Sequence, residues 1–453
     1  MSVVEMSEEE KKKEARKTSI NEGSFSAFSS GIADNYIIAF AQELLATPFQ
    51  IGILNAFFGL LSPLAQFRGS RLIEKQSRKE IVVRYVFLQS LMWIPIALLG
   101  ILFFLGIWQG SLPYFLILFY GLYAFFAGTA AAPWFSWMGD IVPEKEKGKY
   151  FSKRNRITGT LGLVGFLLAA VFLDYLKTGG YVLIGFTTLF SFAFILRGIF
   201  AFRLFKKQHD PGIKLEKHKY YFSFWQFIRR QGNYTKFAFF MGFFHLGMSV
   251  AGPFFIVYML QELKFSYVTY TIISLSATVF YLILVPLAGK FSDKYGNKKL
   301  IYLACVLFSV YPLFWIFLDK PILLIVFPQL IAGIATAAFA IGTTNFIYDT
   351  VTPHRRALCV SYMNILVGIG VFLGSLLGGF LLSLNVFPIK GFFLVFIVSS
   401  VLRAGFALGF ALRFKEIKEF EKSPSVIHYA LHPFRLIQSQ FVWVKDFSKK
   451  IGF

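Results

Sequence analysis

Long apolar segments alternate with short polar ones along almost the whole chain. A transmembrane helix needs about 20 mostly apolar residues, and twelve segments meet that requirement. They cover residues 24–43, 49–67, 82–107, 114–138, 157–176, 181–202, 237–260, 268–289, 300–318, 322–347, 361–383 and 392–412. No segment shows the two-residue alternation of a strand. The pattern predicts an all-α integral membrane protein with twelve transmembrane helices.

Basic residues follow the same alternation, and they fix the expected orientation. With a cytoplasmic N-terminus, 40 of the 46 Lys and Arg residues fall in cytoplasmic segments and four in external connections. Because basic loops stay on the cytoplasmic side, we expect the N- and C-termini and the 203–236 segment there, with the chain in the plasma membrane. The net charge of +22 is then explained by membrane lipids with anionic headgroups. No nucleic-acid partner is expected, since the basic residues do not form one patch.

The composition excludes several other classes. The chain is 56% hydrophobic with 58 Phe and only 15% charged residues, whereas soluble domains carry about 25%. Two cysteines, Cys305 and Cys359, are too few for a disulfide scaffold or a cysteine-built zinc site, so no metal is expected. The acidic run before the first lysines does not fit a signal peptide. We therefore expect residues 1–23 to form a solvated cytoplasmic tail.

An internal repeat divides the chain. The triplet Gln42–Leu44 recurs at Gln261–Leu263, and the same shift of 219 places Glu74 and Lys75 on Asp293 and Lys294. Polar residues matching at both ends of one helix make chance similarity between apolar helices a poor explanation. The repeat predicts two six-helix bundles of parallel orientation. The boundaries are a tail at 1–23, bundles at 24–202 and 237–412, a central loop at 203–236 and a tail at 413–453.

The loop after the second helix of each half resembles the signature of the major facilitator superfamily, Gly-x-x-x-Asp-(Arg/Lys)-x-Gly-Arg-(Arg/Lys). The second half matches at Gly289, Asp293, Lys294, Gly296, Lys298 and Lys299, and departs from the pattern at Asn297. The first half keeps the charges at Glu74, Lys75, Arg78 and Lys79 but has no glycines. The resemblance implies the fold of that family and transport of a small-molecule substrate, with no enzymatic activity and no cofactor. We expect a monomer.

The signature suggests a cytoplasmic gate. Gly296 can adopt a positive φ and close a tight turn between two helices. The basic residues of the motif can pair with carboxylates at other helix ends, for which Asp140 and Asp349 are the candidates. Such pairs would hold the cytoplasmic side closed while the cavity faces outward. The alternative is that these are ordinary loop charges beside a turn, and for the first copy the two interpretations weigh equally.

Asp34 is the strongest candidate for coupling chemistry. It lies midway along the first predicted helix, followed by Asn35 and Tyr36. An ionisable group at that depth is costly and faces a cavity or a partner. It can bind a proton, a cation or a basic substrate group, or it can pair with Arg197 or Arg403. The repeat places Pro253 at the equivalent position of the second half, which favours function over architecture.

Other polar residues in the apolar helices are weaker candidates. His245 can titrate near neutral pH, although a lone histidine in a helix more often serves packing. Asn55, Asn345, Tyr348 and Trp134 can line a polar cavity. Arg197 and Arg403 are expected to extend towards the headgroups rather than bind substrate.

Glycine spacing and amphipathic patterns predict packing and anchoring. Glycines at 159, 162 and 165 and at 370, 374 and 378 predict close helix packing. Residues 220–230 and 425–453 have helical apolar spacing suited to the membrane surface.

These observations favour a secondary active transporter that alternates the exposure of a central site. No phosphate-binding loop is present, so a proton gradient acting through Asp34 is the expected driving force. An uncoupled facilitator is the alternative. A lipid-acting membrane enzyme lacks a catalytic constellation here, and a sensor on a transporter scaffold lacks a signalling domain.

Overall fold

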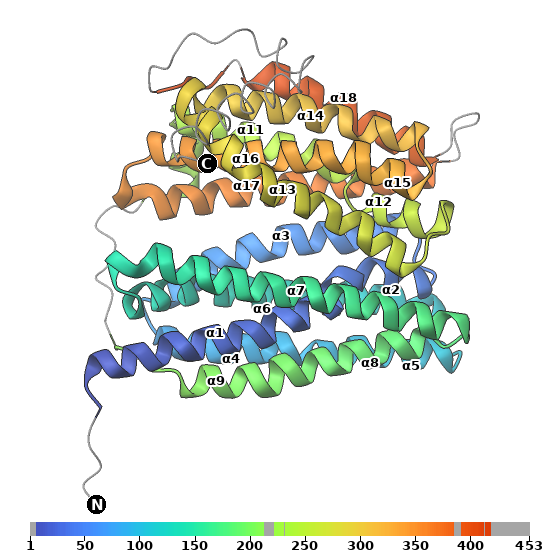
Figure 1. The fold of residues 1–453 in the computed structure, drawn as a ribbon, viewed down its shortest axis with the longest axis horizontal. Helices are drawn as coiled ribbons and strands as arrows, with labels where there is room; N and C mark the ends of the chain where they lie inside the picture. The colour runs from blue at the N-terminus through green and yellow to red at the C-terminus, as the bar shows by residue number, and fades with distance from the viewer. Residues whose placement is uncertain (1–5, 213–221, 231, 385–390, 412, 418–453) are drawn as a thin grey trace, which may run out of the picture.

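The computed structural model describes residues 6–212, 222–230, 232–384, 391–411 and 413–417. The helix predicted at 425–453 therefore lies outside the described residues. Within these ranges the chain is helical and contains no strand. Two sets of long helices lie roughly side by side, one formed by the blue to green part of the chain and one by the yellow to red part (Figure 1).

The first half is a series of helices joined by tight turns. Its elements are α1 (Glu8–Ala33), η1 (Asp34–Tyr36), α2 (Ile37–Glu43), α3 (Pro48–Leu72), α4 (Arg78–Leu91), α5 (Trp93–Phe104), η2 (Gln109–Ser111), α6 (Leu112–Ile141), η3 (Glu144–Glu146), α7 (Lys147–Thr178), α8 (Val182–Phe194), η4 (Ile195–Ala201) and α9 (Phe202–Lys207). The short α10 (Phe224–Arg229) lies in the connection to the second half.

The second half repeats this arrangement. Its elements are α11 (Asn233–Ala251), α12 (Phe254–Val257), η5 (Tyr258–Glu262), α13 (Tyr267–Tyr295), α14 (Asn297–Phe317), α15 (Pro321–Leu324), η6 (Ile325–Gln329), α16 (Leu330–Thr350), α17 (Pro353–Ser383) and α18 (Gly391–Ala411). Each predicted span falls on one helix or on one run of consecutive helices. Eleven of these runs in the described chain are long and apolar enough to cross a membrane. The remaining run, α1 to α2, starts in a charged segment and breaks at Asp34.

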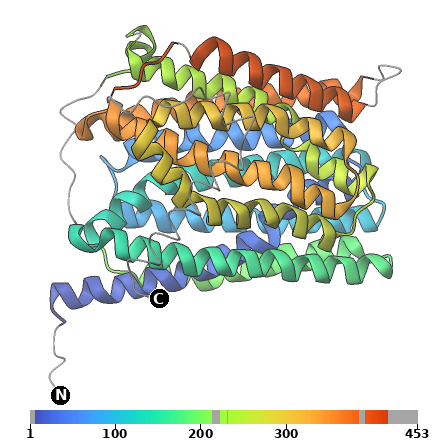
Figure 2. The same cartoon turned by 45° about the horizontal axis from the view of Figure 1, so that its top comes forward.

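The N-terminal tail differs from the prediction. Ser7 caps α1 through a reciprocal capping box with Glu10, and the helix continues without a break into the first predicted span. Ala15 and Ser19 are buried, and the Tyr150 hydroxyl donates a hydrogen bond of 3.2 Å to the Arg16 carbonyl. A solvated tail is therefore the wrong description of residues 15–23, where Ala15, Ser19, Glu22 and Gly23 are buried against the bundle, whereas residues 8–14 are helical but exposed or half-buried. The first turns of α1 extend beyond the neighbouring helices (Figure 2).

The turns lie alternately at two ends of the bundle. We call the end with turns 73–77, 142–146, 208–212 and 351–352 the basic end, and the end with turns 44–47, 105–111, 179–181, 263–266 and 318–320 the distal end. In Figure 1 the N-terminus of α1 lies at the basic end and α2 at the distal end.

Glycines allow the closest helix contacts. A Cβ atom added at Gly370, Gly374 or Gly378 of α17 would collide with backbone carbonyls of α11. The packing prediction for this stripe is therefore confirmed. In α7, Gly165 and Gly162 both lie close to α1, because a Cβ atom at Gly165 would meet the Phe28 carbonyl and one at Gly31 of α1 would collide with the Gly162 carbonyl, whereas Gly159 faces open space.

Candidate functional site

Asp34 lies where the first transmembrane helix changes geometry. Helix α1 ends at Ala33, and Asp34 opens a single 3-10 turn before α2 begins at Ile37. The Tyr123 hydroxyl of α6 donates a hydrogen bond of 3.1 Å to Asp34 Oδ2. The other carboxylate oxygen, Oδ1, is buried and has no hydrogen-bond partner among the described residues. Broken helices in membrane proteins mark binding sites, since their free backbone groups must line a cavity or a polar contact.

Aromatic packing fixes the tyrosine that holds Asp34. Tyr123 is 3% exposed, stacks on Tyr120 with ring centroids 5.5 Å apart, and contacts the Trp93 ring at 4.9 Å. Rings packed on both sides leave the Tyr123 hydroxyl little freedom. The Asp34 carboxylate therefore has one fixed donor, Tyr123, and the Ser30 side chain lies beside it one turn earlier on α1.

Neither arginine extends to the membrane surface as predicted. Arg403 is 2% exposed, and its guanidinium donates to three backbone carbonyls, at 2.7 Å to Phe308, 3.1 Å to Met248 and 3.4 Å to Gly247. The carbonyl groups satisfy the buried guanidinium and remove the need to reach headgroups. Arg197 points inward as well, and its Nη2 donates to Gln89 Oε1 at 2.8 Å. Neither arginine forms an ion pair with Asp34 in the described part of the chain.

Asn35 and Tyr36 join the two halves of the molecule. Tyr36 is fully buried, donates to the Phe166 carbonyl at 2.7 Å, and lies 2.8 Å from the Thr271 hydroxyl of α13. The Tyr270 hydroxyl, also on α13, donates to the Asn35 carbonyl at 3.1 Å. These two residues directly follow Asp34. The chain thus runs from the candidate coupling carboxylate straight into the contact between halves.

Two carboxylates extend this contact at the distal end. Asp174 near the end of α7 accepts hydrogen bonds from the backbone N–H groups of Tyr267 at 2.7 Å and Val268 at 2.8 Å. These groups open α13, so the carboxylate of one half caps a helix of the other. The Tyr267 hydroxyl donates to Glu43 at 2.7 Å. We call these contacts the distal lock, formed by Asn35, Tyr36, Glu43, Asp174, Tyr267, Val268, Tyr270 and Thr271.

The seam between α7 and α13 opens away from the distal lock. In α7 the residues from Gly165 to Leu173 include several buried side chains, but none is buried between Phe151 and Val164. In α13 burial stops after Ile273 and resumes at Ala288. Helices α3 and α17 remain in contact, with Gly59 against Val371 and the Phe67 and Tyr362 rings 5.9 Å apart. The two halves therefore contact one another at the distal end. Towards the basic end, α7 of the first half and α13 of the second no longer bury side chains against each other.

The other predicted site residues each have a hydrogen-bond partner. His245 Nδ1 contacts the Met241 carbonyl of its own helix at 2.8 Å. Asn55 of α3 donates to Ser375 of α17 at 2.8 Å and so joins the two halves. Asn345 donates to Ser292 at 3.1 Å within the second half. Their predicted roles in substrate binding or coupling stay predictions.

The signature residues lie at the basic end. Gly296 has φ +95° and ψ 157°, so the positive-φ turn predicted between α13 and α14 is confirmed. Buried Arg78 forms an ion pair with Asp140, and the buried Asn297 amide donates to Asp349 at 2.9 Å. Both contacts join helices of the same half, so neither bridges the halves in this conformation. The exposed signature residues are Glu74, Lys75, Asp293 and Lys294, while Lys79, Lys298 and Lys299 are half-buried and Gly289 faces open space. The gate function stays a prediction.

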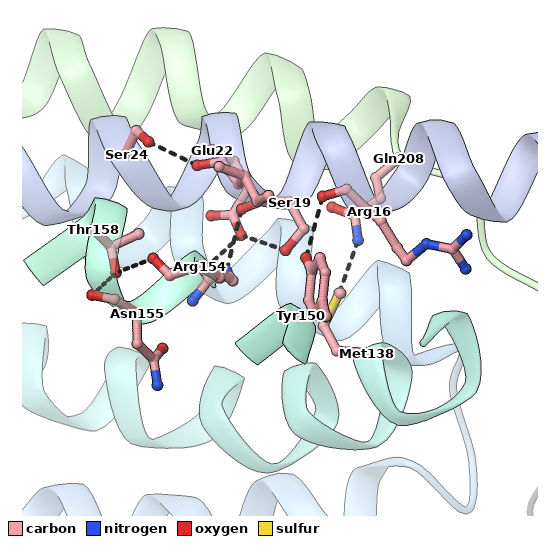
Figure 3. A network of polar contacts seen from close by, with 11 residues as sticks. Arg16, Ser19, Glu22, Ser24, Met138, Tyr150, Arg154, Asn155, Thr158 and Gln208 are labelled. Atoms are coloured by element: carbon pink, nitrogen blue, oxygen red, sulfur yellow. Dashed lines mark hydrogen bonds and ion pairs between the residues drawn. The ribbon is translucent and has the colours of Figure 1, made fainter. Parts of the chain in front are cut away.

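The structure contains a buried ion pair that the sequence analysis does not predict. Glu22 of α1 is 1% exposed and pairs with Arg154 of α7 at 3.0 Å, and the Ser19 hydroxyl donates to the same carboxylate at 3.3 Å. The Arg154 guanidinium also lies over the Trp134 ring, 4.5 Å from its centroid. Figure 3 shows Glu22 and Arg154 facing one another between the two helices. The four-residue spacing of Glu22, Ser26, Ser30 and Asp34 on one helix face was the signal that could have revealed it.

The two helical halves meet along a seam that is closed at the distal end. A buried carboxylate, Asp34, lies at a helix break in the first half. This arrangement is typical of a membrane transporter. The chain belongs to the Major Facilitator Superfamily, whose sequence profile matches residues 23–250 and again residues 237–444. The double match agrees with the internal repeat. The chain is accordingly a transporter and not an enzyme.

Named relatives match only part of the chain. Multidrug resistance protein 1 of Bacillus subtilis (strain 168) is 31% identical over 104 residues, which is 23% of this chain and 26% of that protein. Quinolone resistance protein NorA of Staphylococcus aureus (strain MRSA252) is 28% identical over 104 residues, with the same coverage. The chain thus aligns with about a quarter of the length of these relatives.

Solved structures share the fold over nearly the whole chain. An auto-inhibited POT family peptide transporter matches with a TM-score of 0.68 at 12% identity, covering 90% of this chain and 99% of that one. A bacterial homologue of the human lysosomal transporter Spinster, in an inward-facing and unoccupied conformation, gives 0.66 at 15% identity, covering 89% and 97%. The nucleoside transporter NupG gives 0.63 at 15% identity, covering 88% and 98%. At this identity the likeness shows the fold alone.

Proposed function

We propose that the chain is a secondary active transporter that couples movement of a small organic solute to protons through Asp34. One observation carries this proposal: Asp34 directly precedes Asn35 and Tyr36, which contribute to the distal lock. A change in the charge of Asp34 therefore acts at the helix break that directly precedes Asn35 and Tyr36 of the distal lock. A proton bound at Asp34 would favour one state of the lock over the other, which is what coupling requires.

The orientation and substrate belong to the same proposal. With the basic end cytoplasmic, the conformation described here faces inward, and both termini lie in the cytoplasm of a plasma-membrane protein. The names of the partial relatives support a lipophilic organic substrate, such as a quinolone, as the first compound class to assay. A cationic group on such a compound would be attracted to an ionised Asp34.

The test is Asp34→Asn in reconstituted vesicles with an imposed pH gradient. The amide has the shape of the neutral acid but cannot lose or regain a proton. We expect gradient-driven accumulation to be lost while exchange of substrate down its own gradient continues. Glu146→Gln, an exposed carboxylate at the basic end, is the matched control and should transport normally.

Other outcomes separate the alternatives. A facilitator that uses Asp34 only to hold substrate would lose exchange and net flux together. Wild-type accumulation by a well-folded Asp34→Asn protein would remove Asp34 from the mechanism and refute the proposal.

A further inference from the structure

A cavity lies at the basic end, on the outer face of the first half. Its volume is about 580 Å³, which is within the range of small-molecule sites. Lys11 of α1, Lys79 of α4 and Lys207 of α9 all line it, and α9 packs against both α1 and α4. Figure 1 shows α1 and α9 on the side of the first half away from the second half. The cavity is therefore separate from the seam between the halves.

The residues that line the cavity fall just outside the predicted membrane spans. Lys79 precedes the span at 82–107, and Lys207 follows the span at 181–202. The part of the lining that α1 contributes ends at Thr18, before the first predicted span begins. Residues that flank the apolar part of a transmembrane helix lie among the lipid headgroups. The cavity therefore lies at the depth of the headgroups, on a face that the second half does not cover.

The turn that follows α9 forms one wall of the cavity, and three helices hold it in place. Trp137 Nε1 of α6 donates to the His209 carbonyl at 3.1 Å, and the His209 ring contacts Glu8 of α1 at 3.1 Å. The Ser77 hydroxyl, which caps α4, donates to the Asp210 carboxylate at 3.3 Å. The shape of the cavity is therefore set by contacts with α1, α4 and α6.

Three lysines give the cavity an excess of positive charge over its two carboxylates. Lys11 pairs with Glu8 at 3.3 Å. Lys79 and Lys207 form no ion pair within the described part of the chain. Ammonium groups gathered around one hollow attract an anion, and the low-dielectric protein walls concentrate their field. The lysines therefore favour a ligand with a phosphate group.

The same cavity also presents hydrogen-bond acceptors. Glu14 and Asp210 line it. Gln208 lines it as well, with a side chain that is 1% exposed and an Oε1 atom that has no partner in the described chain. Two carboxylates would repel a bare phosphate, but they accept hydrogen bonds from hydroxyl groups. A ligand that fits both sets of groups carries a phosphate on one side and free hydroxyls on the other.

We propose that this cavity binds a phosphate ester that carries free hydroxyl groups. The phosphate lies among the three lysines, and the hydroxyls donate to the two carboxylates and to Gln208. A glycerol phosphate unit has this chemistry, either as the headgroup of an anionic lipid or as a free molecule. The bound ligand joins α1, α4 and α9 at the basic end. The inference goes beyond the proposed function and does not depend on the role of Asp34.

The experiment is a ligand titration of the full-length purified protein in detergent, with bound molecules counted by native mass spectrometry. The probes are short-chain phosphatidylglycerol, glycerol 3-phosphate, and short-chain phosphatidylmethanol, which has the charge of phosphatidylglycerol but no hydroxyl groups. We expect phosphatidylglycerol to bind more tightly than phosphatidylmethanol. Lys207→Gln should weaken binding of phosphatidylglycerol about fivefold. Lys206→Gln is the matched control, because this exposed neighbour on α9 does not line the cavity, and it should leave binding unchanged.

A second variant tests the hydroxyl contacts separately from the phosphate contacts. Glu14→Ala removes an exposed carboxylate, so it should reduce the preference for phosphatidylglycerol over phosphatidylmethanol without weakening binding of phosphatidylmethanol. Binding of glycerol 3-phosphate as tight as that of phosphatidylglycerol would support the site and identify a free phosphate ester as its ligand. Equal binding of the two lipids by the wild-type protein would overturn the inference. Equal binding of phosphatidylglycerol by Lys207→Gln and Lys206→Gln would overturn it as well.

Discussion

Arg78 and Asn297 occupy equivalent positions in the two halves, and each contacts the aspartate near the end of the long helix that follows it. Arg78 opens α4 and pairs with Asp140 of α6, while Asn297 opens α14 and donates to Asp349 of α16 at 2.9 Å. The shift of 219 that defines the repeat carries residue 78 onto 297. The departure from the family signature at Asn297 therefore keeps the contact and removes the positive charge. The first half depends on an ion pair where the second uses a charge–amide hydrogen bond.

This difference predicts an effect on stability. Asp140→Ala leaves the buried Arg78 guanidinium without its carboxylate, so it should destabilise the protein by about 2 kcal/mol, below the usual cost for a fully buried pair because Asp140 is partly exposed. The Ser136 hydroxyl and carbonyl, at 3.1 and 3.2 Å from Arg78, soften the loss. Thermal unfolding in detergent measures it. Glu144→Ala removes an exposed ion pair with Lys147 and should change little; equal melting of the two variants would contradict the argument.

The signature glycines should differ in their tolerance of a side chain. Gly296 adopts φ +95° and ψ 157°, a region that other residues rarely enter, and strain there costs about 1–3 kcal/mol. Gly289 lies within α13, and a Cβ atom there meets nothing within 4 Å. Gly296→Ala should therefore lower the melting temperature clearly, whereas Gly289→Ala should be neutral or slightly stabilising. A similar loss in both variants would show that the turn geometry is not the constraint.

Hydropathy predicts where the helices lie along the chain, but it does not predict which helix faces and side chains contact one another. Span positions follow from hydropathy because a bilayer demands a fixed apolar length, and the Gly296 turn follows from a residue type that alone permits it. The distal lock depends on which faces of α7 and α13 meet, and helices that are apolar all round give no periodic signal for rotation. Tyr36 was identified as a polar candidate, but its contact with Thr271 was not predictable. Hydropathy places the start of the first span at residue 24, so the sequence analysis assigns the Glu22 carboxylate to a solvated tail.

The orientation of the bundle can be tested directly. If the basic end is cytoplasmic, reporter fusions after Lys207 and at the N-terminus should be active only with cytoplasmic reporters, and a fusion in the 105–111 turn only with external ones. The distribution of Lys and Arg between alternate turns is the reason for this expectation. An external N-terminus would reverse the orientation, and the structure would then be outward-facing.

The distal lock should depend on Asp174 more than on any neighbouring side chain of α7. Its carboxylate accepts from two backbone N–H groups at the start of α13, and such charge-assisted bonds at a helix N-terminus contribute about 1–2 kcal/mol. Asp174→Ala removes this stabilisation from the closed distal end alone, because in an open state the two groups would separate and the N–H groups would meet water. The ratio of closed to open molecules should therefore fall about tenfold.

Spin labels at Gly110 and Lys320, one in a distal turn of each half, report the separation of the distal ends. Both native cysteines are buried, so the introduced ones can be labelled selectively. The wild-type protein should give one short distance, and Asp174→Ala should add a longer component. Thr178→Ala is the matched control, because among the described residues its hydroxyl bonds only to the Tyr175 carbonyl of its own helix, at 2.7 Å. If Asp174→Ala gives the wild-type distance distribution, the capping of α13 does not hold the distal end closed, and the tyrosine contacts of Tyr36 and Tyr267 must suffice.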